Sequence, residues 1–226
     1  MIKRLRKLPH YFFAFAVMLL TTIIFEYSFS KADGFLIINQ LHPKWLDVSF
    51  SYITHLGDGL VSLLVAVILL ILRKKKKAIT LILAFIYSGI LVQIVKRSFP
   101  MPRPRYFFEQ EHFQYTHFVD GVSTYGSNSF PSGHTASAFA MATVLVLVFK
   151  KKRISLACIL AAAIIGYSRI YLAQHFPIDV TVGALAGVSC ALMSYYQVYD
   201  LKLFRSVSVA KRLKQFRMVN SETRPV

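Results

Sequence analysis

Residues 61–70 read Val-Ser-Leu-Leu-Val-Ala-Val-Ile-Leu-Leu, a stretch with one small polar side chain and no charge. A strand of a membrane barrel alternates between apolar and polar residues, and this stretch does not. Because backbone N–H and C=O groups in lipid must be satisfied within their own segment, such a run predicts a membrane-spanning helix. The whole chain is 55% hydrophobic and 16% charged, whereas a soluble domain has about 25% charged residues. These values exclude a soluble globular domain and a disordered chain.

Other segments share this character. A spanning helix needs about 20 mostly apolar residues, and six segments approach or reach that length. They cover residues 10–30, 54–72, 78–96, 132–149, 154–173 and 177–199. Between them, the polar-interrupted stretch 34–53 predicts one or two short surface helices divided at Pro43, and 97–131 predicts one long loop rich in aromatic residues. We therefore expect an all-α integral membrane protein, a single membrane-embedded domain over 1–226 built as a six-transmembrane-helix bundle.

The charges are unevenly placed along this pattern. The chain has 27 lysines and arginines, 10 acidic residues and a formal net charge of +17. If the N-terminus lies inside, 20 of the 27 basic residues fall on the inner side, including the runs 73–77 and 150–153 and the basic tail 202–226. Basic residues beside spans set orientation, so we expect both termini in the cytoplasm. Because these runs flank spans, they indicate topology and attraction to anionic lipids, and no nucleic-acid partner is expected.

Three polar clusters then fall together on the outer side, at or near helix ends. Lysine and arginine bind phosphate, a helix N-terminus supplies free N–H groups to an anion, and a carboxylate beside a histidine fixes its tautomer. Each residue alone has a purely structural explanation, such as snorkelling or helix capping. Their convergence on one face predicts phosphoryl transfer, in which positioning and charge stabilisation dominate. The clusters are Lys96 with Arg103-Pro104, then Pro131-Ser132-Gly133-His134, then Ser168-Arg169 with His175 and Asp179.

The order and spacing of these clusters, over residues 96–179, resemble the three signature motifs of the type 2 phosphatidic acid phosphatase (PAP2) family. The resemblance implies a helical core similar to that of vanadium haloperoxidases. It also implies a phosphohistidine mechanism that uses no metal and no cofactor. By position, His175 is the expected nucleophile, Asp179 orients it and His134 protonates the leaving oxygen. The residues expected to hold the phosphate are Lys96, Arg103, Ser132, Gly133 and Arg169; Ser168 belongs to the motif without an assigned role.

Other phosphatase chemistries do not fit the chain. A cysteine phosphatase needs an arginine six positions after its cysteine, but Ile164 follows Cys158 at that spacing and Tyr196 follows Cys190. There is no Asp-x-Asp sequence for an aspartyl-phosphate route. Nor does the sequence hold a carboxylate cluster of the kind that binds two catalytic metal ions.

The expected activity is hydrolysis of a phosphate monoester or diphosphate of a lipid, at the extracytoplasmic face of a bacterial cytoplasmic membrane. Analogy with small bacterial relatives favours undecaprenyl diphosphate, while phosphatidylglycerol phosphate, phosphatidate and a lipid A phosphate stay open. The expected partners are this lipid and the bilayer, and the sequence predicts no oligomeric state. The alternative from another class is a lipid or solute transporter, because Glu26 and Gln93 are polar residues within spans. The chain lacks the paired interrupted helices of an inverted repeat.

Overall fold

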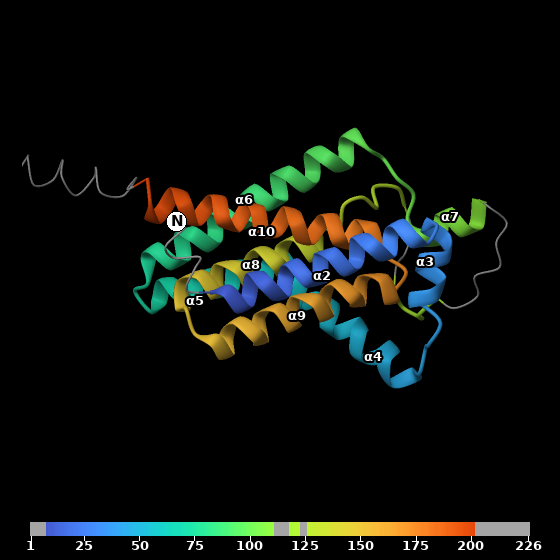
Figure 1. Ribbon diagram of the computed structural model, residues 1–226, viewed down its shortest axis with the longest axis horizontal. Coiled ribbons are helices and arrows are strands. Elements are labelled where there is room, and N and C mark those ends of the chain that lie inside the picture. Colours follow the sequence, from blue (N-terminus) through green and yellow to red (C-terminus); the bar gives the residue numbers. More distant parts are fainter. Residues whose placement is uncertain (1–7, 111–117, 123–125, 202–226) are drawn as a thin grey trace, which may run out of the picture.

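The structure, a computed structural model, describes residues 8–110, 118–122 and 126–201, and this part of the chain is helical without a β-strand (Figure 1). The helices are α2 (Pro9–Ser28), α3 (Lys31–Ile38), α4 (Lys44–Ile53), the 3₁₀ turn η1 (Thr54–Gly57), α5 (Gly59–Ile71), α6 (Lys75–Ser98), α7 (Pro104–Gln110), α8 (Gly133–Phe149), α9 (Lys152–Tyr171) and α10 (Pro177–Tyr199). The prediction of an all-helical membrane protein is confirmed, because several of these helices have the length and apolar character of membrane spans.

The number of spans differs from the prediction. Within the described residues four helices are long and apolar enough to cross a membrane: α2, α6, α9 and α10. The predicted span 54–72 is instead a bent pair, in which α4 with η1 meets α5 at 55°. The bend lies at Asp58, whose extended backbone ends η1 and whose carboxylate accepts a hydrogen bond of 3.1 Å from the N–H of Leu60. Counting the bent pair gives up to five spans, and α8 is a shorter apolar helix of 17 residues, so six spans are not confirmed.

Helices α8 and α10 pack so closely that their backbones touch. A Cβ atom added at Gly183 would lie 2.6 Å from the carbonyl oxygen of Ser132, and one at Gly187 would lie 2.3 Å from that of Ala136. Only glycine permits this approach, as in other membrane helix pairs that meet through small residues. The contact joins the N-terminal half of α10 to the start of α8, which places Asp179 beside Ser132.

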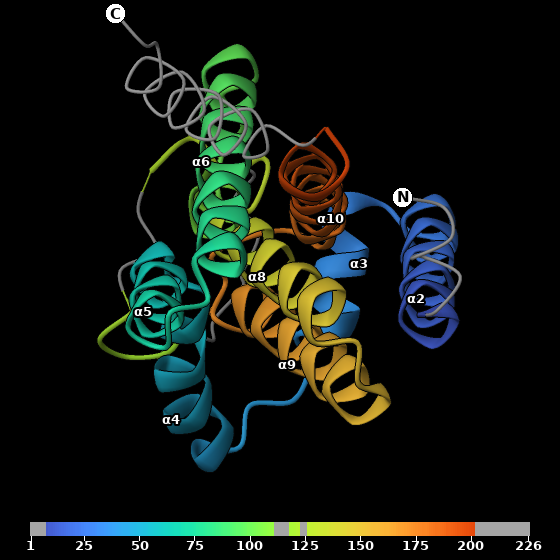
Figure 2. The same cartoon turned by 90° about the vertical axis from the view of Figure 1, so that its left-hand side faces the viewer.

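Helix α2 stands to one side of the group formed by α6, α8, α9 and α10 (Figure 2). It is anchored near its start, where Leu8, Tyr11 and Phe15 are buried. The hydroxyl groups of Tyr11 and Thr143 lie 2.7 Å apart and form a hydrogen bond in the interior. Helix α2 is therefore fixed to the bundle at the end far from the polar motifs.

Aromatic residues from three segments pack together at the opposite end. The ring centroid of Phe35 on α3 lies 5.4 Å from that of Phe108 on α7 and 5.6 Å from that of Phe176, which precedes α10. Helix α7 falls within the stretch 97–131 that was predicted to be one long loop, so that prediction was wrong over these residues. The aromatics of α7 pack against the segment between α9 and α10, and this contact buttresses the connection that carries His175.

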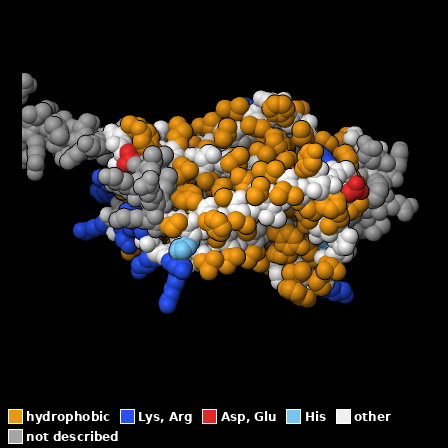
Figure 3. All heavy atoms as spheres, in the orientation of Figure 1, with side chains coloured by type: hydrophobic (Ala, Val, Ile, Leu, Met, Phe, Trp, Pro, Cys, Tyr) orange, Lys and Arg blue, Asp and Glu red, His pale blue; other side chains and the backbone are white. Residues whose placement is uncertain are grey.

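The basic side chains gather at the other end of the molecule (Figure 3). That end holds the connection from α5 to α6, within the run 73–77, and the connection from α8 to α9, within the run 150–153. The end of α9 and the start of α10, which carry the third motif, lie at the opposite end, near α3 (Figure 1). The charge asymmetry found in the sequence is thus an asymmetry between the two ends of the bundle. The predicted basic tail, 202–226, lies outside the described residues.

Candidate active site

The connection between α9 and α10 folds back on the end of α9. Helix α9 ends at Tyr171, and Ala173 takes a left-handed backbone conformation with φ of 51°. The N–H groups of Gln174 and His175 then donate to the carbonyl oxygen of Arg169, at 3.0 and 3.1 Å. This pattern resembles the Schellman motif that commonly ends helices. It brings the side chains of Arg169, Gln174 and His175 into one site although six positions separate the first from the last.

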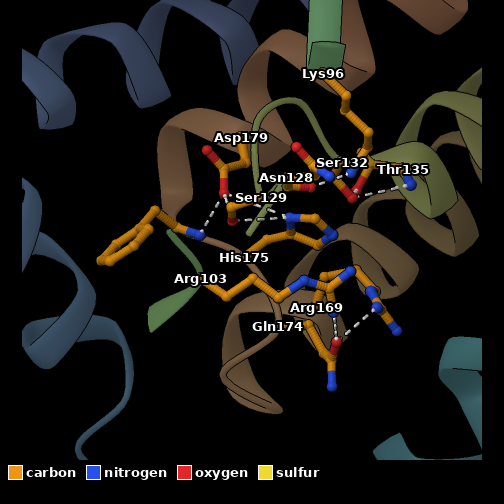
Figure 4. A network of polar contacts seen from close by, with 11 residues as sticks. Lys96, Arg103, Asn128, Ser129, Ser132, Thr135, Arg169, Gln174, His175 and Asp179 are labelled. Carbon is orange, nitrogen blue, oxygen red and sulfur yellow. Dashed lines mark hydrogen bonds and ion pairs between the residues drawn. The ribbon is translucent and has the colours of Figure 1, made fainter. Parts of the chain in front are cut away.

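His175 lies against a buried carboxylate (Figure 4). Its Nδ1 atom is 3.3 Å from Oδ2 of Asp179, and the two side chains are 2% and 0% exposed. The same Oδ2 atom accepts hydrogen bonds from the hydroxyl of Ser129 and, at 3.0 Å, from the N–H of Phe176. The Ser129 hydroxyl oxygen is also 3.3 Å from Nδ1 of His175. Because Nδ1 faces the carboxylate, Nε2 is the nitrogen left for chemistry.

The surroundings keep this imidazole neutral. The pKa of His175 is lowered to about 3: burial is the main cause, Asp179 acts in the opposite direction, and the cations of Arg169 and Lys96 add to the lowering. The ordinary histidine pKa is about 6.5. At neutral pH the ring therefore carries an unprotonated Nε2, the form that a nucleophile requires.

The start of α8 places backbone N–H groups that have no partner within their own helix next to this pair. Ser132 is the N-cap, and its hydroxyl oxygen accepts from the N–H of Thr135 at 3.3 Å and from the Thr135 hydroxyl at 2.8 Å. The backbone N–H of Ser132 donates to the carbonyl oxygen of Asp179 at 2.9 Å. The N–H groups of Gly133 and His134 precede the first intrahelical bond, which Ala136 donates to Ser132. Such N–H groups at a helix N-terminus favour an anion.

Two arginines are held together beside the histidine. Arg169 donates from Nη1 to the Thr54 hydroxyl at 2.6 Å and from Nη2 to Oε1 of Gln174 at 3.3 Å. Nη1 of Arg103 donates to the same Oε1 atom (Figure 4). Within the described residues, the Nε atoms of both arginines are buried without a hydrogen-bond partner.

A cavity of about 550 Å³ reaches this cluster, and its lining includes His134, Arg169 and Gln174. Buried N–H donors that lack acceptors incur a desolvation cost, which an anionic ligand in the cavity would offset. The donor set consists of guanidinium groups and a helix N-terminus, which matches the geometry and charge of a phosphoryl group.

All eight site residues predicted from the sequence lie at this end of the bundle. His175 and Asp179 are in contact, and Arg103 and Arg169 share Gln174. Ser132, Gly133 and His134 form the start of α8, and Lys96 near the end of α6 donates to the carbonyl oxygen of Asn128. Two details modify the prediction: the Ser132 hydroxyl is engaged in capping, and the Ser168 hydroxyl donates to the carbonyl oxygen of Ile165, 2.7 Å away within α9.

Three further residues of the site were missed by the sequence reasoning: Thr54, Ser129 and Gln174. Gln174 directly precedes His175 and Ser129 precedes the second motif by two residues, so proximity in sequence was the available signal. Thr54 lies 115 positions from the arginine that it contacts, and no local pattern marks it. The part of the chain that the structure describes contains no group of three or more His, Cys, Asp or Glu residues placed to hold a metal ion.

The three motifs of the site also fall within a match to a known protein family. The sequence profile of the PAP2 superfamily matches residues 77–203, more than half of the chain and all three motifs. The chain belongs to the PAP2 superfamily. The resemblance inferred from the motif spacing is therefore confirmed.

The chain is similar in sequence to several proteins that are named as lipid phosphatases. The PAP2 chain is 31% identical over 109 residues to a lipid A 1-phosphatase of Rhizobium johnstonii, a match that covers 48% of this chain and 43% of that protein. It is 29% identical over 122 residues to an undecaprenyl-diphosphatase of Sulfolobus acidocaldarius, covering 51% and 52% of the two chains. The matches to the first curated relatives span less than half of their length. Among solved structures, Aquifex aeolicus LpxE is similar, with 39% identity, a TM-score of 0.63, and coverage of 71% of this chain and 91% of that one.

Proposed function

We propose that this PAP2 protein is a membrane lipid phosphatase that works through a phosphohistidine at His175. The observation that carries the proposal is the buried pair of His175 and Asp179 beside two arginines. The carboxylate faces Nδ1 at 3.3 Å, and burial holds the pKa of the imidazole at about 3. A neutral histidine with a free Nε2 next to cationic phosphate ligands is suited to attack phosphorus.

In the first step, Nε2 of His175 bonds to phosphorus while the bond from phosphorus to the leaving oxygen breaks. The electron pair of that bond goes to the leaving oxygen, and His134 supplies its proton. His134 lines the same cavity as Arg169 and Gln174. Burial and the charge of Arg169 lower its pKa to about 4, and the negative charge of a phosphoryl group bound in the cavity acts in the opposite direction and favours the protonated form that the step needs. Asp179 stabilises the positive charge that develops on the imidazole, while Arg103, Arg169 and Lys96 balance the charge on the phosphoryl oxygens.

In the second step, water attacks the phosphohistidine and the bond from phosphorus to Nε2 breaks. His134, now lacking its proton, accepts one from the water, which restores the starting state of both histidines. Phosphate leaves through the cavity of about 550 Å³ that borders His134 and Arg169.

The proposed substrate is a lipid phosphate presented at the extracytoplasmic face. Support comes from relatives named lipid A 1-phosphatase and undecaprenyl-diphosphatase, both of which take their names from lipid-linked phosphate. The proposed orientation rests on the basic residues at the end of the bundle opposite the site (Figure 3), because positive charge beside spans favours the cytoplasm.

The decisive experiment is release of inorganic phosphate from a panel of lipid phosphates by the purified full chain in detergent. We expect hydrolysis that persists in EDTA, is inhibited by vanadate, and is lost in His175→Ala. A soluble phosphate ester serves as control for effects of chelation on the lipid itself. Hydrolysis that EDTA abolishes and magnesium restores would contradict the proposed chemistry, and transport without phosphate release would favour the alternative class.

A further inference from the structure

The side chain of Gln174 forms hydrogen bonds with both arginines of the site. Its Oε1 atom accepts a hydrogen bond from Nη1 of Arg103 and another, of 3.3 Å, from Nη2 of Arg169. The residue is 4% exposed, so these contacts lie within the protein. Figure 4 shows both hydrogen bonds to its side-chain oxygen. A single acceptor thus fixes the distance between two guanidinium groups that come from segments 66 positions apart.

The chemistry of the acceptor matters because the two guanidiniums carry like charges. Arg169 is buried, with 7% of its surface exposed, and an arginine stays protonated under physiological conditions. Repulsion between two such cations is stronger in a poorly solvated site than in water. A carboxylate placed between them would hold them together but would also cancel part of their charge. An amide oxygen holds both and leaves the full positive charge available to a phosphoryl group.

The position of Gln174 is set by backbone contacts that need no ligand. Its N–H donates to the carbonyl oxygen of Arg169 at 3.0 Å, in the turn formed by the left-handed Ala173. On the other side, Thr54 accepts from Arg169 at 2.6 Å. The Arg169 guanidinium is therefore held from two directions before substrate arrives. Fixing a flexible side chain in advance reduces the entropy lost on binding.

From these contacts we infer that Gln174 is a positioning residue, which holds Arg103 and Arg169 as a preassembled cradle for a phosphoryl dianion. For turnover the inference rests on the proposed phosphatase function. For binding it stands on its own, since phosphate and vanadate can occupy the cradle without any reaction of a lipid. The sharpest consequence is that charge at position 174, rather than its size, governs the affinity for the anion.

The test compares three variants of the full chain in detergent. Gln174→Leu removes the acceptor, and Gln174→Glu keeps an acceptor of similar size but adds a negative charge. Gln197→Leu is the matched control, because Oε1 of Gln197 accepts one hydrogen bond of 2.6 Å from Tyr87 outside the site. Binding of inorganic phosphate and of vanadate is measured by calorimetry, and turnover of a soluble phosphate ester is measured in parallel.

We expect Gln174→Leu to weaken the binding of both anions about tenfold, because each guanidinium loses a charge-assisted hydrogen bond. Gln174→Glu should weaken binding about 100-fold, since its carboxylate competes with the anion for both arginines. In both variants KM should rise with the dissociation constant while kcat changes less than about threefold, because the cradle holds ground state and transition state alike. The control should match the native protein.

Native affinity for phosphate in Gln174→Leu, or in Gln174→Glu, would overturn the inference. If Gln174→Leu fails to fold, Gln174→Glu decides alone, because it retains the acceptor and changes only the charge. If the native protein binds phosphate but hydrolyses no lipid phosphate, the proposed function is contradicted. The affinities of the two variants for phosphate would still decide the role of Gln174. A native protein that binds neither anion would overturn the inference itself.

Discussion

Replacing Asp179 by asparagine should separate the orienting carboxylate from the rest of the site. Oδ2 of Asp179 accepts from Ser129, from the N–H of Phe176 at 3.0 Å and from His175 at 3.3 Å. Asparagine is almost the same size, but its amide has no charge to balance a phosphorylated imidazole and can present donors where acceptors are needed. The histidine tautomer is then no longer fixed, a defect that costs about 10,000-fold in kcat in serine-protease triads. We expect a loss of that order here.

Ser129→Ala should have a smaller effect, because it removes one of the three hydrogen bonds to Oδ2. A hydrogen bond to a charged group contributes about 1.5–3 kcal/mol, which corresponds to a loss in kcat of about 10- to 150-fold. Ser194→Ala is the matched control: this serine is also fully buried, but its hydroxyl donates to the carbonyl oxygen of Ala191, 2.9 Å away within α10. It should leave kcat within about twofold of the native value.

The assay is steady-state hydrolysis of nitrophenyl phosphate in detergent, with thermal unfolding of each variant measured alongside it. The comparison applies to variants whose unfolding midpoint stays near that of the native protein. An Asp179→Asn variant that keeps more than a tenth of native kcat would contradict the orienting role of the carboxylate, and equal activity of Ser129→Ala and Ser194→Ala would contradict the role of Ser129.

Three further predictions concern the acid, the histidine and the topology. His134→Ala should cut turnover about 100- to 10,000-fold for a lipid alcohol leaving group and less for nitrophenolate, and equal losses for both would remove its role as acid. The pKa of His175 is about 6.5 in the unfolded chain and about 3 in the folded one, so between these pH values the unfolded state binds one more proton. The free energy of unfolding should therefore fall as the pH drops below 6.5. If the native protein and a folded His175→Phe variant show the same pH dependence of unfolding, this prediction is contradicted. In a variant without the native cysteines, a single cysteine at Leu41 should react with an impermeant maleimide in intact cells, and one at Lys75 should react only after the membrane is permeabilised. The reverse result would show the opposite orientation.

Much of the fold was predictable because apolar runs, and the residues that begin or end helices, are local signals in the sequence. The prediction for 177–199 coincides with α10, since Pro177 is favourable at the first position of a helix. The span predicted over 54–72 is not one straight helix, because Asp58 divides that stretch by capping α5. Helix α7 was missed because Pro100, Pro102 and Pro104 suggested a loop, whereas Pro104 is the first residue of α7 and burial of Phe108 stabilises the helix.

The site was predictable to the extent that its residues belong to spaced motifs. Arg169, His175 and Asp179 have positions that a spacing rule captures. Ser129, Gln174 and Thr54 act through the turn after α9 and through contacts between distant segments, neither of which sequence spacing encodes. Backbone geometry, in particular the left-handed Ala173, decides which side chains face the arginines.

The proposed mechanism requires that His175 carry the phosphoryl group during turnover. Rapid-quench trapping with a ³²P-labelled substrate, followed by alkaline work-up and peptide mapping, measures this directly. The proposed mechanism predicts alkali-stable, acid-labile label on the peptide that contains His175, lost in His175→Ala and accumulating in a His134 variant when the leaving group is nitrophenolate. Label on His134, or turnover at the native rate with no labelled histidine at any quench time, would contradict it.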